Sequence, residues 1–211
     1  MVHTPKVVKG TSMGRSKAQP IQQPDDTTCG PSALKIALSI FGLKKALATL
    51  IDLCKTNSNG TSTKNLIHAI NSLGFSVLAV EYSTLAHLQS ALKYTQNNRR
   101  AVMVSYLYDL DEKDQPHPDS GHWATVASYL PSKNRIVLLD SASGKHKSYT
   151  WADFRERWYD FDLKRKKITK TGKKFKLIRH WQPQLMLVIA RDVKHLPKFT
   201  SPTSKLFSVT S

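Results

Sequence analysis

One short segment of the chain places a cysteine where its chemistry could be used. In "QPDDTTCGPSAL", residues 23–34, Cys29 stands directly before a Gly-Pro pair and an apolar run. Apolar residues then recur at separations of three and four until Gly42, which indicates a buried helix over 30–41. Cys29 therefore lies at the start of that helix, where unpaired backbone N–H groups and the helix dipole favour a thiolate. Because the thiolate is the attacking form of cysteine, this pattern predicts a nucleophile.

The second cysteine lies in a different setting. Cys54 ends "ATLIDLC", an apolar stretch that reads as part of a second buried helix. A thiol in apolar surroundings resists ionisation and behaves as a small hydrophobic side chain. We therefore interpret Cys54 as a structural residue and Cys29 as the reactive one.

A base and an orienting acid occur together farther along the chain. "SGHWATVASYL" (120–130) alternates like a strand, a turn follows, and "RIVLLDSASG" (135–144) reads as a second strand ending in small residues. An antiparallel hairpin returns Asp140 to the end where His122 begins. If the register puts both on one face, the imidazole and the carboxylate meet, as a nucleophilic cysteine requires. The register itself is not readable from the sequence.

Two other uses of these residue types are weaker. His117 and His122 could be loop ligands of a metal, but no further Cys or His completes a zinc spacing, so we expect neither metal nor cofactor. Asp25 or Asp26 could orient the imidazole instead of Asp140. They stand in a Pro-initiated turn, however, where such side chains usually bond to the local backbone.

These residues together resemble the C39-like cysteine peptidases, a papain-like family. The resemblance rests on Gln23 six places before Cys29, "TCGPSAL" leading into a helix, "GHW" starting a strand, and an aspartate ending the next strand. As an order of elements it extends over residues 18–192. It implies that Cys29 is the nucleophile, His122 the general base and then acid, Asp140 the orienting residue, and Gln23 the oxyanion-hole donor. No cofactor is implied.

One departure from the family pattern concerns the loop after Asp140. The family often has Asp-Pro at this point, whereas this chain has Ser141, Ala142, Ser143 and Gly144. We expect this loop to be freer and to hold the aspartate less firmly. Gln22 offers the same amide as Gln23, and only the six-residue spacing to the cysteine favours Gln23.

The resemblance and the hydrophobic pattern predict an α+β class: a papain-like cysteine peptidase fold with an N-terminal nucleophile helix packed on an antiparallel β-sheet. We expect residues 1–18 to be a mobile basic tail, 19–195 the C39-like peptidase domain, and 196–211 a second mobile tail, since both ends are rich in Ser, Thr, Lys and Pro. The predicted helices are 30–41, 44–54, 62–73, 84–96 and 150–159, and the predicted strands are 76–82, 101–107, 122–130, 135–140 and 184–191.

Composition limits the setting in which the protein works. With 211 residues, 40% of them hydrophobic, one well-buried domain is expected. No stretch approaches a membrane span, and the first twenty residues lack the apolar core of a signal peptide. Two cysteines do not make a disulfide framework. We expect a cytoplasmic monomer without a membrane span, and, because no P-loop pattern is present, a stand-alone version of the family.

A strongly basic segment is the feature that the resemblance explains least. The formal net charge is +17, and "KRKKITKTGKKFKLIR", Lys164–Arg179, holds nine Lys and Arg without an acid. A basic insert or hairpin hinged at Thr171–Gly172 is expected. Its partner could be an acidic substrate, a nucleic acid or an anionic membrane surface, because all three attract lysine-rich surfaces.

The sequence therefore favours a cysteine peptidase that hydrolyses a peptide or protein substrate through an acyl-enzyme on Cys29. The same triad also serves transglutaminase-like or deamidase-like acyltransferases, which differ only in the acceptor. Two further alternatives are a non-catalytic binding module and a basic nucleic-acid-binding module that kept the fold.

Overall fold

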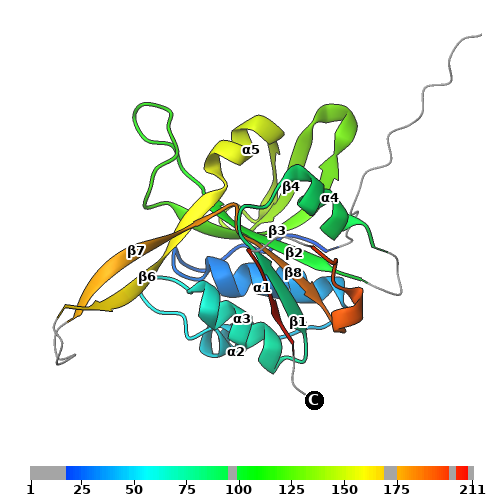
Figure 1. The fold of residues 1–211 in the computed structure, drawn as a ribbon, viewed down its shortest axis with the longest axis horizontal. Coiled ribbons are helices and arrows are strands. Elements are labelled where there is room, and N and C mark those ends of the chain that lie inside the picture. Colours follow the sequence, from blue (N-terminus) through cyan, green and yellow to red (C-terminus); the bar gives the residue numbers. More distant parts are fainter. Residues whose placement is uncertain (1–17, 95–98, 169–174, 200–202, 209–211) are drawn as a thin grey trace, which may run out of the picture.

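The centre of the computed structural model, which describes residues 18–94, 99–168, 175–199 and 203–208, is a seven-stranded sheet (Figure 1). Its strands run in the order β5-β4-β3-β2-β8-β1-β9, and every neighbouring pair is antiparallel. The strands are β1 (Ser76–Val80), β2 (Ala101–Leu107), β3 (Gly121–Leu130), β4 (Arg135–Asp140), β5 (Lys145–Thr150), β8 (Met186–Ala190) and β9 (Ser204–Phe207).

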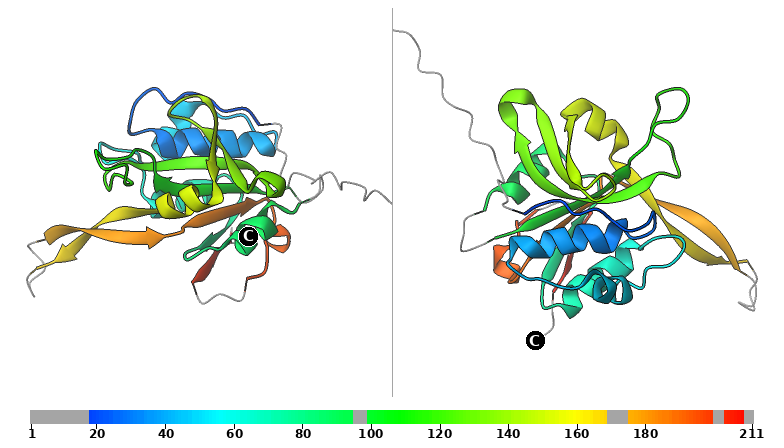
Figure 2. Two further views of the ribbon diagram at one scale, coloured as in Figure 1. Left: turned by 90° about the horizontal axis from the view of Figure 1, so that it is seen from above. Right: turned by 180° about the vertical axis from the view of Figure 1, so that it is seen from behind.

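Helices cover both faces of this sheet, as Figure 2 shows from above. Alternate residues of β2 separate the two cores: Ala101 and Met103 pack on one side, whereas Val102 and Val104 pack on the other. The first side carries α1 (Cys29–Ile40), α2 (Leu47–Leu53) and α3 (Thr63–Ser72), and the second carries α4 (Leu85–Leu92) and α5 (Trp151–Arg157). The predicted helix packed on an antiparallel sheet is confirmed.

The helix α1 is the most buried helix of the fold for reasons that its sequence contains. All of its residues except Lys35 and Ser39 are buried, in agreement with apolar residues nearly all round the helix. Thr125 on β3 donates a buried 2.8 Å hydrogen bond to the carbonyl of Ala33, which ties the helix to the sheet. The chain leaves the helix through Gly42, whose φ of +74° suits glycine.

The predicted helices and strands are all present within a few residues, and two strands of the main sheet, β5 and β9, were missed. The predicted helix 84–96 ends at Leu92, and residues 95 and 96 lie outside the described part of the chain. The predicted helix 150–159 ends at Arg157. The missed strand β5, "KHKSYT", lacks apolar alternation and forms because β4 pairs with it along its whole length.

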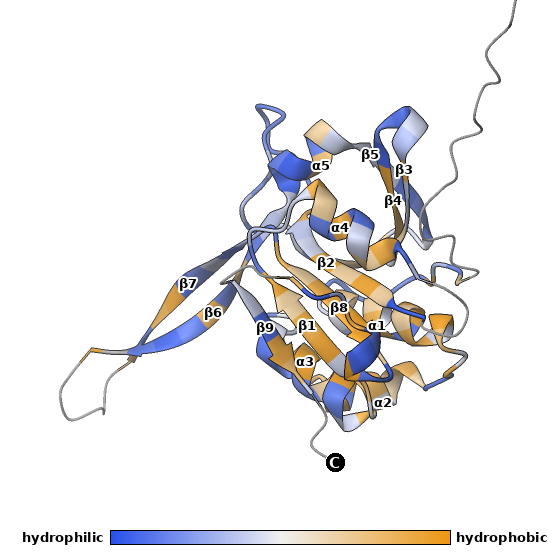
Figure 3. Cartoon of the chain, turned by 45° about the vertical axis from the view of Figure 1, so that its right-hand side comes forward, coloured by the Kyte–Doolittle hydropathy of each residue, from blue (hydrophilic) through white to orange (hydrophobic). Residues whose placement is uncertain are grey.

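The basic segment belongs to a hairpin longer than predicted. Strands β6 (Tyr159–Lys167) and β7 (Phe175–Pro183) form a separate two-stranded sheet that projects from the body (Figures 1 and 3). We call residues 159–183 the arm. Its hairpin begins five residues before the predicted segment and ends four after it, because Tyr159 pairs with Pro183. The predicted hinge at Thr171–Gly172 lies outside the described residues.

The predicted tail 196–211 is wrong over its described strand. Residues 204–207 form β9, which pairs with β1 and is the edge strand of the sheet. Leu206 and Phe207 stay largely exposed there, so pairing rather than burial holds the strand, and the sequence carries little apolar signal for it. At the other end, Ala18 is buried, and residues 1–17 of the predicted basic tail lie outside the described part.

Candidate active site

Cys29 opens α1 and faces a cleft. Thr28 is the residue before the helix, and the first turn contains no acidic residue that would oppose a thiolate. Gly30 lets the loop between α2 and α3 approach this turn closely, since a Cβ there would come within 2.8 Å of the Thr61 Cβ. The Cys-Gly pair therefore places the sulfur at the helix start with a wall of the cleft beside it. Cys29 itself is 7% exposed.

His122 and Asp140 are brought together by the register of β3 and β4. Thr125 pairs with Leu139. Because the strands are antiparallel, His122, which precedes Thr125, and Asp140, which follows Leu139, lie at the same end of the pair. The distance from His122 Nε2 to Asp140 Oδ1 is 2.9 Å, and both side chains are buried. The register of the two strands thus brings the His122 imidazole and the Asp140 carboxylate into contact, which the sequence could not establish.

Groups other than His122 also donate hydrogen bonds to Asp140. Its Oδ2 accepts hydrogen bonds from the Ser143 amide at 3.0 Å, the Ser143 hydroxyl at 2.5 Å and the Tyr108 hydroxyl at 3.2 Å. Burial by itself would raise the pKa of this carboxyl, but the bonds from His122 and Ser143 outweigh it and hold the pKa well below its usual range. The loop expected to leave Asp140 loosely held instead holds it, because Ser143 donates both its amide and its hydroxyl to the carboxylate.

The imidazole of His122 lies between a carboxylate and the thiol. Burial acts to lower its pKa, but the hydrogen bonds with Asp140 and Cys29 prevail and raise the pKa to about 9. Since Nε2 is held by Asp140, Nδ1 is the nitrogen left for Cys29. The rings of Tyr106 and Tyr108 lie 5.7 and 4.9 Å from the imidazole, between centroids, and restrict its orientation. This arrangement favours a protonated imidazole beside Cys29.

Gln23 lies beside this group and is tied to the loop after β4. The backbone N–H of Gln23 donates to the Ser141 carbonyl at 2.8 Å. The Ser141 hydroxyl donates to the side-chain Oε1 of Gln23, also at 2.8 Å. Its Nε2 donates to the Asp25 carbonyl at 2.8 Å, which leaves a second N–H on the carboxamide. Gln22, by contrast, is exposed. The side chain is therefore held in place by bonds to its oxygen and one of its N–H groups.

The alternative residues weighed from the sequence do not join the group. Asp25 is exposed, and its Oδ1 accepts from the Thr27 amide at 2.9 Å and the Thr27 hydroxyl at 2.7 Å, which is the local turn expected there. His117 accepts a bond from the Asp119 amide within its own loop. Within the described ranges, no three His, Cys, Asp or Glu residues are grouped as a metal site would require. Cys54 is fully buried, which raises the pKa of its thiol to about 12.

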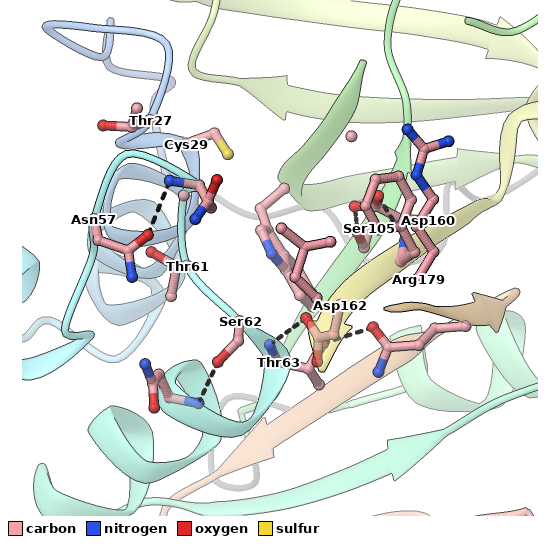
Figure 4. Close-up of a pocket in the computed structure, with 18 of the residues that line it drawn as sticks. Thr27, Cys29, Asn57, Thr61, Ser62, Thr63, Ser105, Asp160, Asp162 and Arg179 are labelled. Atoms are coloured by element: carbon pink, nitrogen blue, oxygen red, sulfur yellow. Dashed lines mark hydrogen bonds between the residues drawn. The ribbon is translucent and has the colours of Figure 1, made fainter. Parts of the chain in front are cut away.

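The cleft at Cys29 has a volume of about 700 Å³ and runs between the α2–α3 loop and the arm (Figure 4). The loop contributes residues 57–63, and the opposite wall comes from β2, β3 and the arm. Asp162 and Gln182 on the arm anchor it to α3, since Thr63 donates its amide to Asp162 at 3.0 Å and its hydroxyl to Gln182 at 2.8 Å.

A second buried carboxylate near His122 was missed by the sequence reasoning. Asp160, at the root of the arm, accepts hydrogen bonds from the Ser105 hydroxyl and, at 2.7 Å, from the Phe161 amide. It lies directly against Gly121, where a Cβ would collide with its carboxyl group. Burial raises its pKa to about 6 against the opposing bond from Ser105. Nothing local marks Asp160, Ser105 or Tyr108, whose importance arises from contacts between distant strands.

Comparisons with known proteins agree with this geometry. The model of the Peptidase C39 family matches residues 17–170. The chain is 27% identical over 157 residues to the mesentericin transport/processing ATP-binding protein MesD of Leuconostoc mesenteroides, a match that covers 70% of this chain and 18% of that protein. Among the residues described, no helix is long and apolar enough to cross a membrane.

Solved structures show the same fold. The peptidase domain of Streptococcus ComA, a bifunctional ABC transporter involved in quorum sensing, aligns with a TM-score of 0.57 at 20% identity, over 83% of this chain and 99% of that domain. A C39-like peptidase from Bacillus anthracis aligns with a TM-score of 0.57 at 12% identity, over 85% and 97%. A double-glycine-motif protease from an AMS/PCAT transporter, solved with its leader peptide, aligns with a TM-score of 0.54 at 12% identity, over 85% and 98%.

Proposed function

Because the chain belongs to the peptidase C39 family of cysteine peptidases, we propose that it hydrolyses a peptide amide bond through an acyl-enzyme on Cys29. The observation that carries this proposal is the buried 2.9 Å contact between His122 Nε2 and Asp140 Oδ1, with Cys29 as the other group that raises the pKa of the imidazole. We assign one role in the reaction to each of these three residues. Asp140 stabilises the imidazolium, His122 holds the proton, and Cys29 supplies the attacking sulfur.

The first half of the reaction forms a thioester. The Cys29 thiolate attacks the carbonyl carbon, and the electron pair of the C=O bond moves to oxygen, which becomes an oxyanion. When this intermediate collapses, the C–N bond breaks, and the His122 imidazolium gives its proton to the leaving amine. The amine product departs and the acyl group stays on the Cys29 sulfur.

The second half restores the enzyme. Neutral His122 takes a proton from water, whose oxygen attacks the thioester carbon, and the C–S bond breaks to release a carboxylic acid and the thiolate. In both halves the oxyanion needs donors. The free N–H of Gln23 and the backbone N–H at the start of α1 are the groups that we assign to it, with a preorganised donor stabilising it by about 3 kcal/mol.

The substrate class that we propose is a precursor polypeptide. The relatives named above include a transport and processing protein and a protease bound to a leader peptide. The chain spans 18% of the length of MesD, so we extend to it only the peptide-cleaving step. An added amine that captures the acyl group in place of water would identify the acyltransferase alternative instead.

Alkylation of the two cysteines tests the proposal without knowledge of the substrate. At pH 6, iodoacetamide should modify Cys29 at least about a hundredfold faster than Cys54, because only Cys29 has an imidazolium partner and lines a cleft. His122→Ala should slow the reaction of Cys29 by about tenfold or more. Mass spectrometry of the digested protein measures both rates. Equal rates at the two cysteines, in protein that is folded by circular dichroism, would refute the nucleophile assignment.

A further inference from the structure

The arm extends away from the body as a ribbon of two strands (Figures 1 and 2). The chain leaves the body at Trp158 and returns at Gln184, whose backbone N–H donates to the Trp158 carbonyl at 2.8 Å. Among the described residues, β6 and β7 pair only with each other. A two-stranded ribbon is marginally stable in water, so the packing of the body does not explain the length of the arm.

One face of the arm is rich in apolar side chains. Alternate residues of a strand point to the same face, and on β7 these are Phe175, Leu177, Arg179 and Trp181. Cross-strand partners also share a face, so Leu163, which pairs with Arg179, belongs to it. We call Leu163, Phe175, Leu177 and Trp181 the apolar stripe of the arm.

The apolar stripe is largely exposed to solvent. Leu177 is 61% exposed and Phe175 is 49% exposed, and the other two members are exposed as well. Figure 3 shows hydrophobic residues interspersed with hydrophilic ones along the arm. Apolar groups gathered on one exposed surface of a folded domain indicate a site of interaction.

Lysines occupy the opposite face of the arm. Its cross-strand pairs include Lys164 with Ile178 and Lys166 with Lys176, and these three lysines are exposed. From residue 163 to residue 183 the sequence contains no acidic residue. Positive charge therefore continues along the arm beyond its root.

Among the described residues, carboxylates meet the arm near its root. Asp160 and Asp162 accept hydrogen bonds from the body, and Asp119, in the loop before β3, pairs with Arg179. Within the described ranges, Arg165 on the side of the apolar stripe forms no ion pair with a carboxylate, and neither do the lysines opposite. The outer part of the arm thus combines exposed apolar side chains with positive charge that no described carboxylate pairs with.

We propose that the arm binds the surface of an anionic lipid bilayer, with the apolar stripe at the level of the headgroups and the lysines and arginines beside the lipid phosphates. Trp, Phe and Leu on one side of a basic element are typical of elements that lie in a membrane interface. The ribbon is one layer thick, so the long side chains of the lysines reach past its edges toward the headgroups. This inference goes beyond the proposed function, since it requires no chemistry at Cys29.

A bilayer accounts for both faces of the arm, whereas a nucleic acid accounts for one. The phosphates of RNA or DNA would pair with the lysines and arginines, but they offer nothing to exposed leucine. A second copy of the chain would bring together two arms of the same charge, which repel each other. An anionic bilayer presents negative headgroups above an apolar interior, so it complements the charge and the apolar stripe together.

Two matched pairs of variants of the full chain test this surface, one for charge and one for apolar contact. The arm lysine variant, Lys166→Gln with Lys176→Gln, removes a cross-strand pair of the arm. The body lysine variant, Lys44→Gln with Lys45→Gln, removes two exposed lysines between α1 and α2. Both variants therefore have the same net charge.

For apolar contact, Phe175→Ser alters the stripe, and Phe207→Ser removes the same type of side chain from the edge strand β9, where it is 36% exposed. Circular dichroism verifies that each variant is folded. Binding is measured by co-sedimentation with vesicles of equal parts phosphatidylglycerol and phosphatidylcholine, and with vesicles of phosphatidylcholine alone.

We expect the unmodified protein to bind the anionic vesicles and not the neutral ones. The arm lysine variant should lower the partition coefficient by about tenfold or more, because each positive charge near an anionic surface contributes about fivefold. The body lysine variant should lower it by less than about threefold, since salt screens charges that lie away from the membrane. Phe175→Ser should lower it by about fivefold, and Phe207→Ser by less than about twofold.

Equal losses in the arm and body variants would show that the net charge of +17 alone drives binding, and would overturn the proposal. Absence of binding to the anionic vesicles would overturn it as well. If Phe175→Ser binds vesicles as the unmodified protein does, while the arm lysine variant loses affinity for single-stranded oligo(dT), the arm is a nucleic-acid-binding surface and the proposal is wrong.

The two proposals fail independently of each other. The Cys29→Ala protein should bind the anionic vesicles as tightly as the unmodified protein, because the arm needs no thiol. If Cys29 proves unreactive toward iodoacetamide, the proposed function fails and vesicle binding still tests the arm. If Cys29 reacts and the anionic vesicles are not bound, only the present inference fails.

Discussion

Two buried carboxylates near His122 show opposite electrostatic behaviour. Asp140, at the end of β4, has its pKa held well below the usual range, whereas burial raises the pKa of Asp160, at the root of the arm, to about 6. Both are desolvated, so burial alone does not distinguish them. The difference lies in the donors: Asp140 faces an imidazole, two groups of Ser143 and the Tyr108 hydroxyl, while among the described residues Asp160 accepts from the Ser105 hydroxyl and one amide alone.

This difference suits the proposed chemistry. A carboxylate that stays charged behind His122 stabilises the imidazolium that holds the proton. A full negative charge on the cleft side would oppose both the Cys29 thiolate and the oxyanion, and the raised pKa of Asp160 reduces that charge toward acidic pH. The two carboxylates are thus expected to respond very differently to the same Asp-to-Asn change.

The largest effect is expected from Asp140→Asn. The amide NH₂ would face His122 Nε2 and favour the tautomer with hydrogen on Nδ1, which then cannot accept the thiol proton of Cys29. The kcat for peptide cleavage should fall by about a thousandfold or more, and alkylation of Cys29 at pH 6 should fall with it. Steady-state kinetics and mass spectrometry measure the two. A variant with normal alkylation would contradict the role of Asp140.

A smaller effect on the Asp140 side is expected from Gln23→Ala. Gln23 contributes neither proton nor charge to Cys29, but its amide is assigned to the oxyanion, which exists only along the reaction path. The kcat should fall by about a hundredfold with little change in KM, and alkylation of Cys29 should stay nearly intact.

The neighbouring Gln22 provides the control for this change, because it is exposed and carries the same side chain. Gln22→Ala should leave kcat within about twofold. If Gln22→Ala and Gln23→Ala cost the same, or if Gln23→Ala slows alkylation as much as cleavage, the oxyanion assignment is wrong.

The smallest effect is expected from Asp160→Asn, and it should appear mainly in stability. The folded-state pKa of about 6 lies above the unfolded value near 3.8, so this group's stabilising contribution is complete below pH 3.8 and is lost as pH rises through 6. Asn resembles the protonated form, since its oxygen can accept from Phe161 and its NH₂ can donate to Ser105. The variant should match the unmodified protein at pH 4 and be more stable by about 1–2 kcal/mol at pH 7.

Urea unfolding at both pH values measures that difference, and kcat at pH 7 should change by less than about threefold. A stability difference that is constant from pH 4 to pH 7 would show that Asp160 does not titrate in this range. A loss of kcat comparable to that of Asp140→Asn would abolish the distinction between the two carboxylates.

Local patterns in the sequence were enough to predict much of this molecule. The 3.6-residue period after Cys29 predicts α1, and the turn between two alternating runs predicts the β3–β4 hairpin. Both come from contacts between residues close in sequence. The spacing of Gln23 and Cys29 and the basic run Lys164–Arg179 are likewise readable without a structure, because they depend on residue type and order alone.

The tertiary structure alone decided which side chains meet. The register that brings Asp140 to His122, the Ser143 and Tyr108 donors, and the strands β5 and β9 all depend on pairing that leaves no periodic signal in their own segments. Asp160 is the clearest case, because its partner Ser105 lies 55 residues away. A hydrogen bond across that separation exists only once the sheet and the arm have folded together, since neither residue constrains the other in the extended chain.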